Sequence, residues 1–449
     1  MNTLRQSRFL PLPLVPLPAL SAFARTTAAL CAMGALSISA AGCAGILGLE
    51  DRELDPDASG ASTTSTSSQT ASTSGSTGTG TASTDVVDAA PVDRDAEARD
   101  ASKGFDPGDA TVDAPAPVVD ASSSCPATGV CYLASGLTAP WLVVADSANV
   151  YWTELGSTGS TADGAVKACA VTGCAQPLVY AAHLVGPRGI AIDTQRVYWD
   201  TQAADPSVAS GGVFSCPLAG CSGAPTQLAS GTQPYGLAVD GTYVYWVDEW
   251  DLSVHRVPKN GTGADHFLVA ANDANNPMFD MGQVAVDATY LYVNDQTGGG
   301  LYRVPIVRGA EPTLFYDGIN GFDWPVAVDS TYVYYGESDS NNVGHILRIN
   351  KATPSSMTAI ATGLSNPYGV AVDGPTSPLV YWADNGTGSN DGAIGRVSAL
   401  GTGQVNLATS LSDPSGIAVN ASYVFWTDLG LYDGSEYVAG GGFIARVAK

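Results

Sequence analysis

The sequence predicts an all-β fold, and three observations support this. One sequence motif recurs seven times between residues 131 and 449. It consists of an aliphatic residue near an Asp or Asn, followed by a strand such as Val-Tyr-Trp that ends in an acidic residue. Counted from Asp146 to Asn420, the steps between copies are 47, 47, 47, 42, 44 and 47 residues. No window of this region shows a helical period of apolar residues. A repeat of this length, filled with short strands and turns, is typical of the blades of a β-propeller.

The third copy shows the elements of one repeat in order. Residues 227–229 predict a short outer strand, and residues 236–239 an inner strand whose small side chains suit the crowded axis of a ring. Residues 240–241, Asp-Gly, are a tight-turn signal. Residues 243–246 are β-branched and aromatic, as in a strand buried on both faces, and residues 253–257 form the next strand.

Closure of the ring is predicted by the order of these elements. The last copy ends at its third strand, residues 443–447, whereas a matching outer strand, residues 132–137, precedes the first copy. If the two ends pair, no blade has an open edge. We therefore predict a seven-bladed β-propeller with four-stranded blades over residues 125–449, in which the N-terminal strand closes the last blade.

Residues 1–43 have the features of an export signal. A basic start is followed by the uncharged residues 26–42 and by Ala40-Ala41-Gly42-Cys43. That ending resembles the bacterial lipobox, so we predict lipidation of Cys43, with Ala44 favouring the outer membrane. The alternatives are a plain secretory signal cut nearby or a transmembrane anchor, for which 17 mildly apolar residues are short.

Residues 44–124 predict a disordered tether. They are dominated by Ser, Thr, Ala, Gly, Asp and Pro, and lack the apolar surface that would offset the entropy of ordering. The formal net charge of the whole chain is −24, which argues against a nucleic-acid partner. We expect the protein to contact the membrane through the lipid anchor only. The sequence does not indicate an oligomeric state.

Six of the eight cysteines lie in pairs at the ends of short turns. Cysteines that face each other across a tight hairpin can meet disulfide geometry, and an oxidising compartment preserves the bond. A zinc site built from two pairs is the alternative, but the pairs belong to separate blades and lack the two-residue spacing of a zinc knuckle. The predicted disulfides are Cys125–Cys131, Cys169–Cys174 and Cys216–Cys221.

Residues 236–240, Gly-Leu-Ala-Val-Asp, together with residues 151–154 and 425–428, resemble the YWTD-type β-propellers of the LDL receptor family. The resemblance covers residues 131–449. It implies a binding and scaffolding module, not an enzyme. This chain departs from that family in two respects. The ring of the family has six blades, whereas seven copies occur here, and the family lacks the cysteine hairpins. The arrangement also looks like tethered, repeat-bearing bacterial lipoproteins without an assigned activity.

An acid closes each aromatic strand. Asp200 stands one residue early, and the other six are in phase: Glu154, Asp248, Asp295, Glu337, Asp384 and Asp428. Carboxylates on one rim can bind a cation such as Ca²⁺, or attract a basic partner. We favour the alternative, implied by the family resemblance, that they tie neighbouring repeats together by hydrogen bonds.

The segment that leads from the outer strand of one blade to the inner strand of the next, here called the crossing, differs between copies. One equivalent position holds Trp141, Arg188, Tyr235, Gly282, Trp324, Tyr368 and Ser415. Aromatic residues beside an arginine at the mouth of a channel would suit a sugar, a peptide or a cationic side chain. We therefore predict a ligand-binding face at Trp141, Arg188, Tyr235, Trp324 and Tyr368. The alternative is that each ring fills a gap between blades.

The sequence assigns no catalytic residue, cofactor or resident metal. His183, His255, His266 and His345 lie at different phases of the repeat, and no nucleophile elbow or phosphate-binding loop is present. The leading hypothesis is an exported, lipid-anchored propeller that binds a protein, peptide or glycan partner through one face. One alternative is a propeller enzyme of the lyase or lactonase type with a metal or His at the channel mouth. Another is a passive structural protein of the cell envelope.

Overall fold

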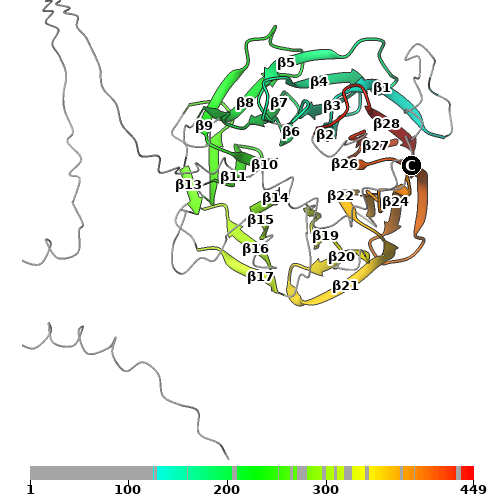
Figure 1. Ribbon diagram of the computed structural model, residues 1–449. Coiled ribbons are helices and arrows are strands. Elements are labelled where there is room, and N and C mark those ends of the chain that lie inside the picture. Colours follow the sequence, from blue (N-terminus) through cyan, green and yellow to red (C-terminus); the bar gives the residue numbers. More distant parts are fainter. Residues whose placement is uncertain are drawn as a thin grey trace, which may run out of the picture. The chain divides into compact units, whose positions relative to one another are not determined.

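In the computed structural model, the repeats form seven four-stranded antiparallel sheets arranged as the blades of a propeller (Figure 1). This confirms the predicted fold class. The structure describes residues 125, 129–158, 160–204, 210–250, 252–262, 266–269, 281–295, 300–307, 311–317, 326–338, 343–374, 378–388, 390–430 and 436–449. Residues 1–43, with Cys43, and residues 44–124 lie outside this set. The described residues contain no helix that is long and apolar enough to cross a membrane.

Each blade has an inner, a second, a third and an outer strand. The inner strands are β2 (Pro140–Ala145), β6 (Ile190–Ile192), β10 (Pro234–Val239), β14 (Met281–Val286), β18 (Val326–Val328), β22 (Pro367–Asp373) and β26 (Pro414–Val419). The second strands are β3 (Asn149–Glu154), β7 (Arg196–Thr201), β11 (Tyr243–Asp248), β15 (Tyr290–Asp295), β19 (Tyr332–Ser338), β23 (Leu379–Asp384) and β27 (Tyr423–Asp428).

The other two strands complete each sheet toward the rim. The third strands are β4 (Gly164–Ala170), β8 (Gly211–Pro217), β12 (Ser253–Pro258), β16 (Gly300–Pro305), β20 (Gly344–Asn350), β24 (Gly392–Ser398) and β28 (Gly442–Ala448). The outer strands are β5 (Leu178–Leu184), β9 (Thr226–Gly231), β13 (His266–Val269), β17 (Thr313–Asp317), β21 (Thr353–Leu364), β25 (Val405–Leu411) and β1 (Cys131–Leu137).

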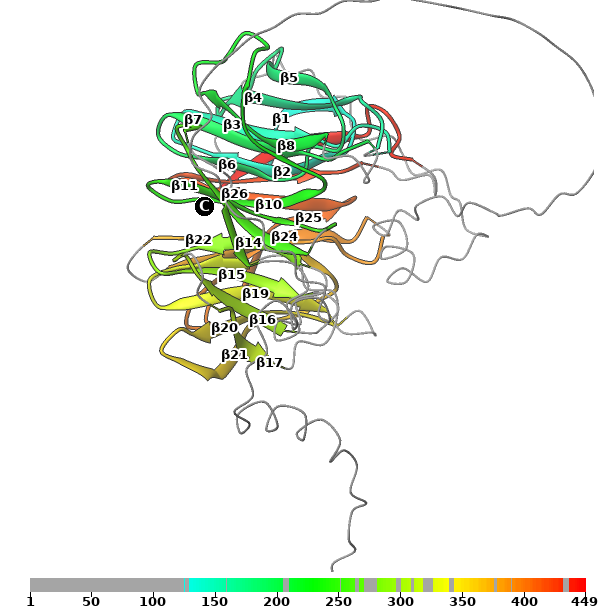
Figure 2. The ribbon, with the colours of Figure 1, turned by 90° about the vertical axis from the view of Figure 1, so that its left-hand side faces the viewer.

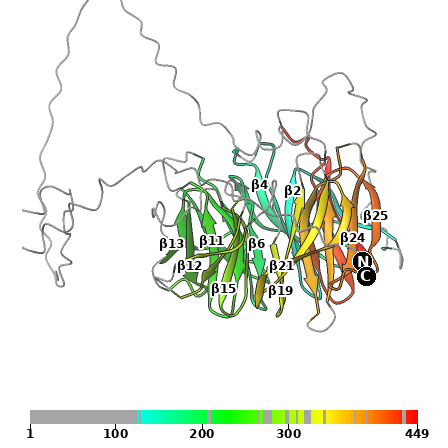
Figure 3. The same ribbon diagram turned by 90° about the horizontal axis from the view of Figure 1, so that it is seen from below.

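Because the strands alternate in direction, the connections emerge at two opposite faces of the ring (Figure 2 and Figure 3). We call the loop face the one that carries the crossings into the inner strands and the loops between the second and third strands. The turn face carries the turns between the inner and second strands and the hairpins between the third and outer strands. The blades are numbered 1 to 7 from β2 onward.

The N-terminal strand closes the ring, as predicted. β1 pairs antiparallel with β28, from Cys131 opposite Arg446 to Leu137 opposite Gly442, and completes blade 7 in the order β1-β28-β27-β26 (Figure 1). Leu133 of β1 is fully buried. Strands from the two ends of the repeat region therefore share one sheet.

The second strands carry most of the largest fully buried side chains. Trp152, Trp199, Trp246, Trp382 and Trp426 are all at most 1% exposed. The third strand adapts to them. Opposite Trp382 stands Gly395, where a Cβ atom would lie 2.2 Å from the indole. In blade 6, a glycine on the third strand thus makes room for the indole on the second strand.

The Asp that follows the inner strand holds the turn and the next strand together. Oδ1 of Asp146 accepts hydrogen bonds from the N–H groups of Ala148 and Asn149 at 2.6 and 2.7 Å, and Oδ2 accepts one from the Tyr151 hydroxyl at 3.0 Å. The same Asp–Tyr hydrogen bond occurs in Asp193–Tyr198, Asp240–Tyr245, Asp287–Tyr292, Asp329–Tyr334 and Asp373–Tyr381. In blade 7 both partners change, to Asn420 and Phe425, and Asn420 Nδ2 donates to the carbonyl of Asp146 across the seam of the ring.

Three lysines join neighbouring blades at the turn face. Lys259 of blade 3 lies 2.8 Å from Asp193 of blade 2, and Lys351 of blade 5 lies 2.7 Å from Asp287 of blade 4. Lys449 makes the corresponding ion pair with Asp373. Burial by itself raises the pKa of Asp193, but hydrogen bonds from Lys259 and from the turn lower it to about 2.

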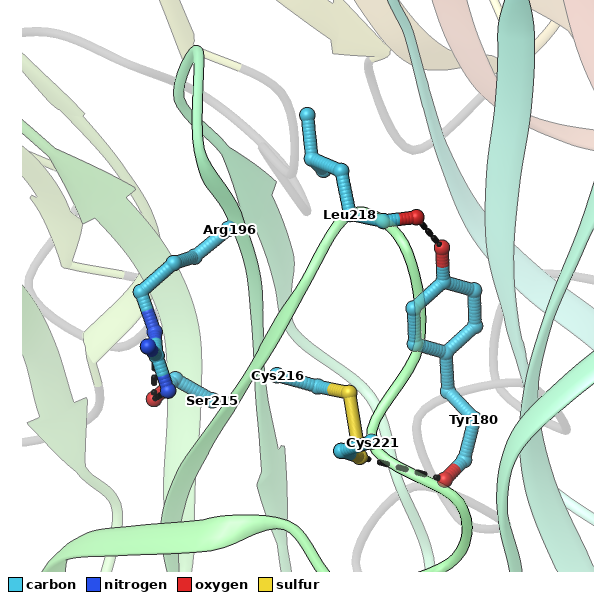
Figure 4. The surroundings of a disulfide bond; sticks show 6 residues. All are labelled: Tyr180, Arg196, Ser215, Cys216, Leu218 and Cys221. Carbon is cyan, nitrogen blue, oxygen red and sulfur yellow. Dashed lines mark hydrogen bonds between the residues drawn. A yellow bond between two sulfur atoms is a disulfide. The ribbon is translucent and has the colours of Figure 1, made fainter.

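The three predicted disulfides are present, with Cα–Cα distances of 5.3, 5.6 and 5.5 Å. Cys169–Cys174 and Cys216–Cys221 close the hairpins between the third and outer strands of blades 1 and 2, at the turn face. Cys125–Cys131 lies at the start of β1, the outer strand of blade 7. Around the Cys216–Cys221 bond, the carbonyl of Leu218 accepts a hydrogen bond from Tyr180 of blade 1 at 2.5 Å (Figure 4). The disulfide hairpin of blade 2 is thereby docked on the outer strand of the preceding blade.

We expect Leu133→Ala to lower the free energy of unfolding by about 2 to 5 kcal/mol, because it opens a cavity in the sheet that closes the ring. Denaturant unfolding with intact disulfides measures the effect. Leu314→Ala is the matched control, since Leu314 also lies on an outer strand but is 49% exposed. Equal losses in the two variants would show that β1 is no more important than any other outer strand.

Candidate functional site

Four of the five residues predicted for the ligand-binding face, Trp141, Arg188, Tyr235 and Tyr368, converge near the axis of the ring. Trp141, Tyr235 and Tyr368 belong to one apolar cluster with Leu155 and with side chains of blades 4 and 7, which only the axis brings together. The rings of Trp141 and Tyr368 meet edge to face at 6.0 Å. The guanidinium of Arg188 lies 5.6 Å from the centre of the Tyr235 ring.

These four side chains are buried. The exposed fractions of Trp141, Arg188, Tyr235 and Tyr368 are 5, 8, 1 and 8%. They pack against one another and against Leu429 and Tyr437, from the last loop of the loop face. Trp324 lies outside the described residues. Ligand binding by this group stays a prediction, and it requires the loop residues above the rings to move.

The acids at the ends of the second strands hold the crossings in place. The Asp248 carboxylate accepts hydrogen bonds from the N–H groups of Thr232 and Gln233, at 2.9 and 3.2 Å, and from that of Trp250 at 3.1 Å. Asp384 and Asp428 accept equivalent bonds from their own crossings and loops. Each carboxylate therefore links the strand that enters its blade to the loop that leaves it.

Two acids of this series depart from that pattern. Glu154 accepts a hydrogen bond from Trp152 Nε1 at 2.9 Å and pairs with Lys167 at 2.9 Å. Asp200, one residue early, accepts from the N–H groups of Arg188 and Gly189 at 2.9 Å. Burial is the main cause that raises the pKa of Asp200 to about 7, against the opposing effects of these N–H groups and of the Arg188 charge.

The remaining acids of the rim are less fully described. Glu337 is partly buried, and the side chain of Asp295 lies outside the described part of the chain. Within that part, no group of three or more His, Cys, Asp or Glu side chains is placed to hold a metal ion. Cation binding by the rim as a whole stays a prediction.

Trp250 is an exposed residue that the sequence analysis did not single out. It lies two residues after Asp248 on the loop face and is 54% exposed. The same position holds Gly156, Gly386 and Gly430 in other blades, all with positive φ. The signal was present in the sequence: Trp250 belongs neither to the repeated aromatic strand nor to the crossing position.

The described histidines lie away from the inner strands. His183 is exposed on the outer strand β5. On the third strand of blade 3, His255 stacks on Trp246 with 5.0 Å between ring centres. His345 of β20 stands opposite Glu337 of β19 in the sheet of blade 5. The side chain of His266 lies outside the described residues, on the outer strand β13.

Two shallow hollows lie at the outer edge of blade 1. One, of about 150 Å³, is lined by Cys169, Cys174 and Tyr180. The other, of about 280 Å³, lies between β1 and residues 174–177. Both adjoin the disulfide hairpin of blade 1, so neither belongs to the loop face.

No family model and no curated protein matches this chain. Solved structures do. A catalytically inactive histidine-to-alanine variant of virginiamycin B lyase from Staphylococcus aureus, bound to quinupristin, is 12% identical with a TM-score of 0.51, over 71% of this chain and 98% of that one. A streptogramin B lyase is 12% identical with a TM-score of 0.50, over 71% and 97%.

A nidogen/laminin complex also matches, with 16% identity and a TM-score of 0.38 over 48% of this chain and 82% of that one. At 12% identity, the likeness to the two lyases shows the fold alone. The comparisons therefore define the chain as a β-propeller and assign no activity to it.

We expect Asp200→Asn to change how stability depends on pH. The raised pKa means that the folded protein retains a proton between about pH 4 and 7 that the unfolded chain releases, so the free energy of unfolding falls as pH rises through this window. Without the carboxyl, that fall should shrink by on the order of a few kcal/mol.

Urea unfolding at four pH values between 4.5 and 7.5 measures this slope. Asp163→Asn is the control, because the loop hydroxyls and N–H groups keep the pKa of that exposed carboxyl below its usual value. A slope that Asp200→Asn leaves intact would show that Asp200 is ionised throughout.

Proposed function

We propose that this protein is an exported binding module that takes a protein, peptide or glycan partner on its loop face. The observation that supports this most directly is the exposure of Trp250. A large aromatic ring left in water gains free energy when a partner covers it, and Trp is enriched among the residues that dominate binding energy.

The composition of the loop face narrows the chemistry of the partner. Glu249 precedes Trp250 in the chain, and on the same face the loop of blade 1 carries the hydroxyls of Ser157 and Thr161 and the carboxylate of Asp163. A face that presents an aromatic ring together with hydroxyls and carboxylates suits a sugar or a basic peptide. The net charge of −24 disfavours a polyanion.

We further propose that the protein is carried to the cell envelope and anchored by a lipid on Cys43, with residues 44–124 as the tether to an outer membrane. The disulfides support export, because such bonds persist in an oxidising compartment and are rare in the cytosol. The lipobox-like sequence supports the anchor.

The enzymatic alternative is a lyase or lactonase with a metal or His at the channel mouth. The likeness to two lyases shows only a shared fold. His183, His255 and His345 lie on third and outer strands, where they do not face the axis. A binding role therefore agrees better with the described residues, and a passive structural role would leave Trp250 without a partner.

We expect Trp250→Ala to lower retention of the partner at least tenfold, which corresponds to the loss of one dominant aromatic contact. The full chain is immobilised and exposed to two probes from the envelope of the producing cell, its purified polysaccharides and its solubilised proteins. Leu400→Ala is the matched control, because Leu400 is 75% exposed on the turn face.

Retention that is lost in Trp250→Ala and preserved in Leu400→Ala would support the loop face. Glycosidase or protease treatment of the retained material then identifies its class. Equal retention by both variants would move the site away from Trp250, and no retention by the wild type would favour a structural role.

For the anchor, we expect Cys43→Ser to abolish incorporation of a labelled fatty acid and to move the protein from the membrane to the soluble envelope fraction. Cys31→Ser is the control within the same segment. Membrane association that persists in Cys43→Ser would indicate a different mode of attachment.

A further inference from the structure

Two buried carboxylates lie close together at the loop face of blade 7. Asp428 is fully buried and Asp413, in the crossing that enters the blade, is 8% exposed. The N–H group of Asp413 donates to Asp428 Oδ2 at 3.3 Å, so the two residues are in direct contact. From blade 6, Asn385 Nδ2 donates to Asp413 Oδ1.

This group is a departure from the repeat. The residue that precedes the inner strand is Ala139, Gln233 and Asn366 in blades 1, 3 and 6, and among these described crossings Asp413 alone adds a second carboxylate beside the repeated acid. In the sequence, Asp280 stands at the equivalent position of blade 4, outside the described residues. The position of Asn385 is held by Leu155 and Leu429 in blades 1 and 7. The repeat itself therefore does not require these residues.

No basic side chain among the described residues compensates the charge of the two carboxylates. Elsewhere, Glu154 pairs with Lys167 and Asp193 with Lys259. In the described part of the chain, no Lys, Arg or His contacts Asp413 or Asp428. Two adjacent buried anions are costly unless a proton or a cation is shared between them.

Asn385 provides a third oxygen at this place. The residue is 4% exposed, and its Oδ1 has no hydrogen-bond partner, although its Nδ2 touches Asp413. A buried acceptor without a partner costs about 1 to 3 kcal/mol. The amide torsion is broad and two-fold, so a half-turn exchanges Nδ2 and Oδ1 without rotamer strain. Such a turn gives up the hydrogen bond from Nδ2 to Asp413 and sets two oxygens face to face, which is favourable when a cation lies between them.

We propose that Asp413, Asp428 and Asn385 bind a divalent cation of the calcium type between blades 6 and 7. Carboxylate and amide oxygens are the ligands that Ca²⁺ prefers, and it tolerates irregular geometry. The ion would neutralise the carboxylates, satisfy the amide oxygen, and tie the loop of blade 6 to the crossing of blade 7. This site is independent of the partner proposed for Trp250.

The test uses the full chain stripped with a chelator and titrated with Ca²⁺ alone at pH 7.5, by calorimetry and by thermal unfolding. We expect one Ca²⁺ per chain, a melting temperature that rises by several degrees at saturation, and weaker binding of Mg²⁺. Asp413→Asn should weaken Ca²⁺ binding at least a hundredfold. Asn is compatible with the fold there, because Asn366 holds the equivalent position.

Two further variants complete the design. Asn385→Leu, which restores the residue of Leu155 and Leu429, should weaken Ca²⁺ binding about tenfold while the metal-free protein still melts cooperatively. Asp163→Asn, on another loop of the same face, should bind Ca²⁺ as the wild type does. Absence of saturable binding, or unchanged affinity in Asp413→Asn, would overturn the proposal. So would a wild type whose melting temperature responds to pH but not to Ca²⁺, since the pair would then share a proton.

Discussion

The pairing of β1 with β28 closes the ring and holds blades 1 and 7 side by side. It joins strands that are separated by the whole repeat region, and it removes the edge that blade 7 would otherwise expose. The disulfide hairpins belong to blades 7, 1 and 2, on both sides of this seam. Cross-links are therefore concentrated where the ring depends on the longest-range contact.

Within the closed ring, polar side chains join the elements at both faces. At the turn face, the Asp–Tyr pair fixes the turns of blades 1 to 6, and three lysines reach back to the preceding blade. At the loop face, Asp248 and its equivalents fix the crossings. Blade 7 shows that the Asp and the Tyr of the turn depend on each other. Both are replaced there, by Asn420 and Phe425, and Asn420 donates a hydrogen bond to blade 1 instead.

The residues with functional potential are those that the repeat does not explain. Trp250 stands where blades 1, 6 and 7 have glycine, and Asp413 stands where blades 1, 3 and 6 have Ala, Gln and Asn. Both lie on the loop face, where the backbone is held by repeated carboxylates and the remaining side chains are free to vary. A scaffold of this kind separates stability, which the repeated residues provide, from recognition.

The number of blades, the strand that closes the ring and the three disulfides could be predicted from the residues alone, because they follow from periodicity and local spacing. Which side chains are covered could not, because it depends on how the blades meet at the axis. Trp141, Tyr235 and Tyr368 lie in blades 1, 3 and 6, and they are buried because the axis brings them together with Leu429 and Tyr437. The contact of Asp413 with Asn385 likewise arises between blades, and no local pattern of residues encodes it.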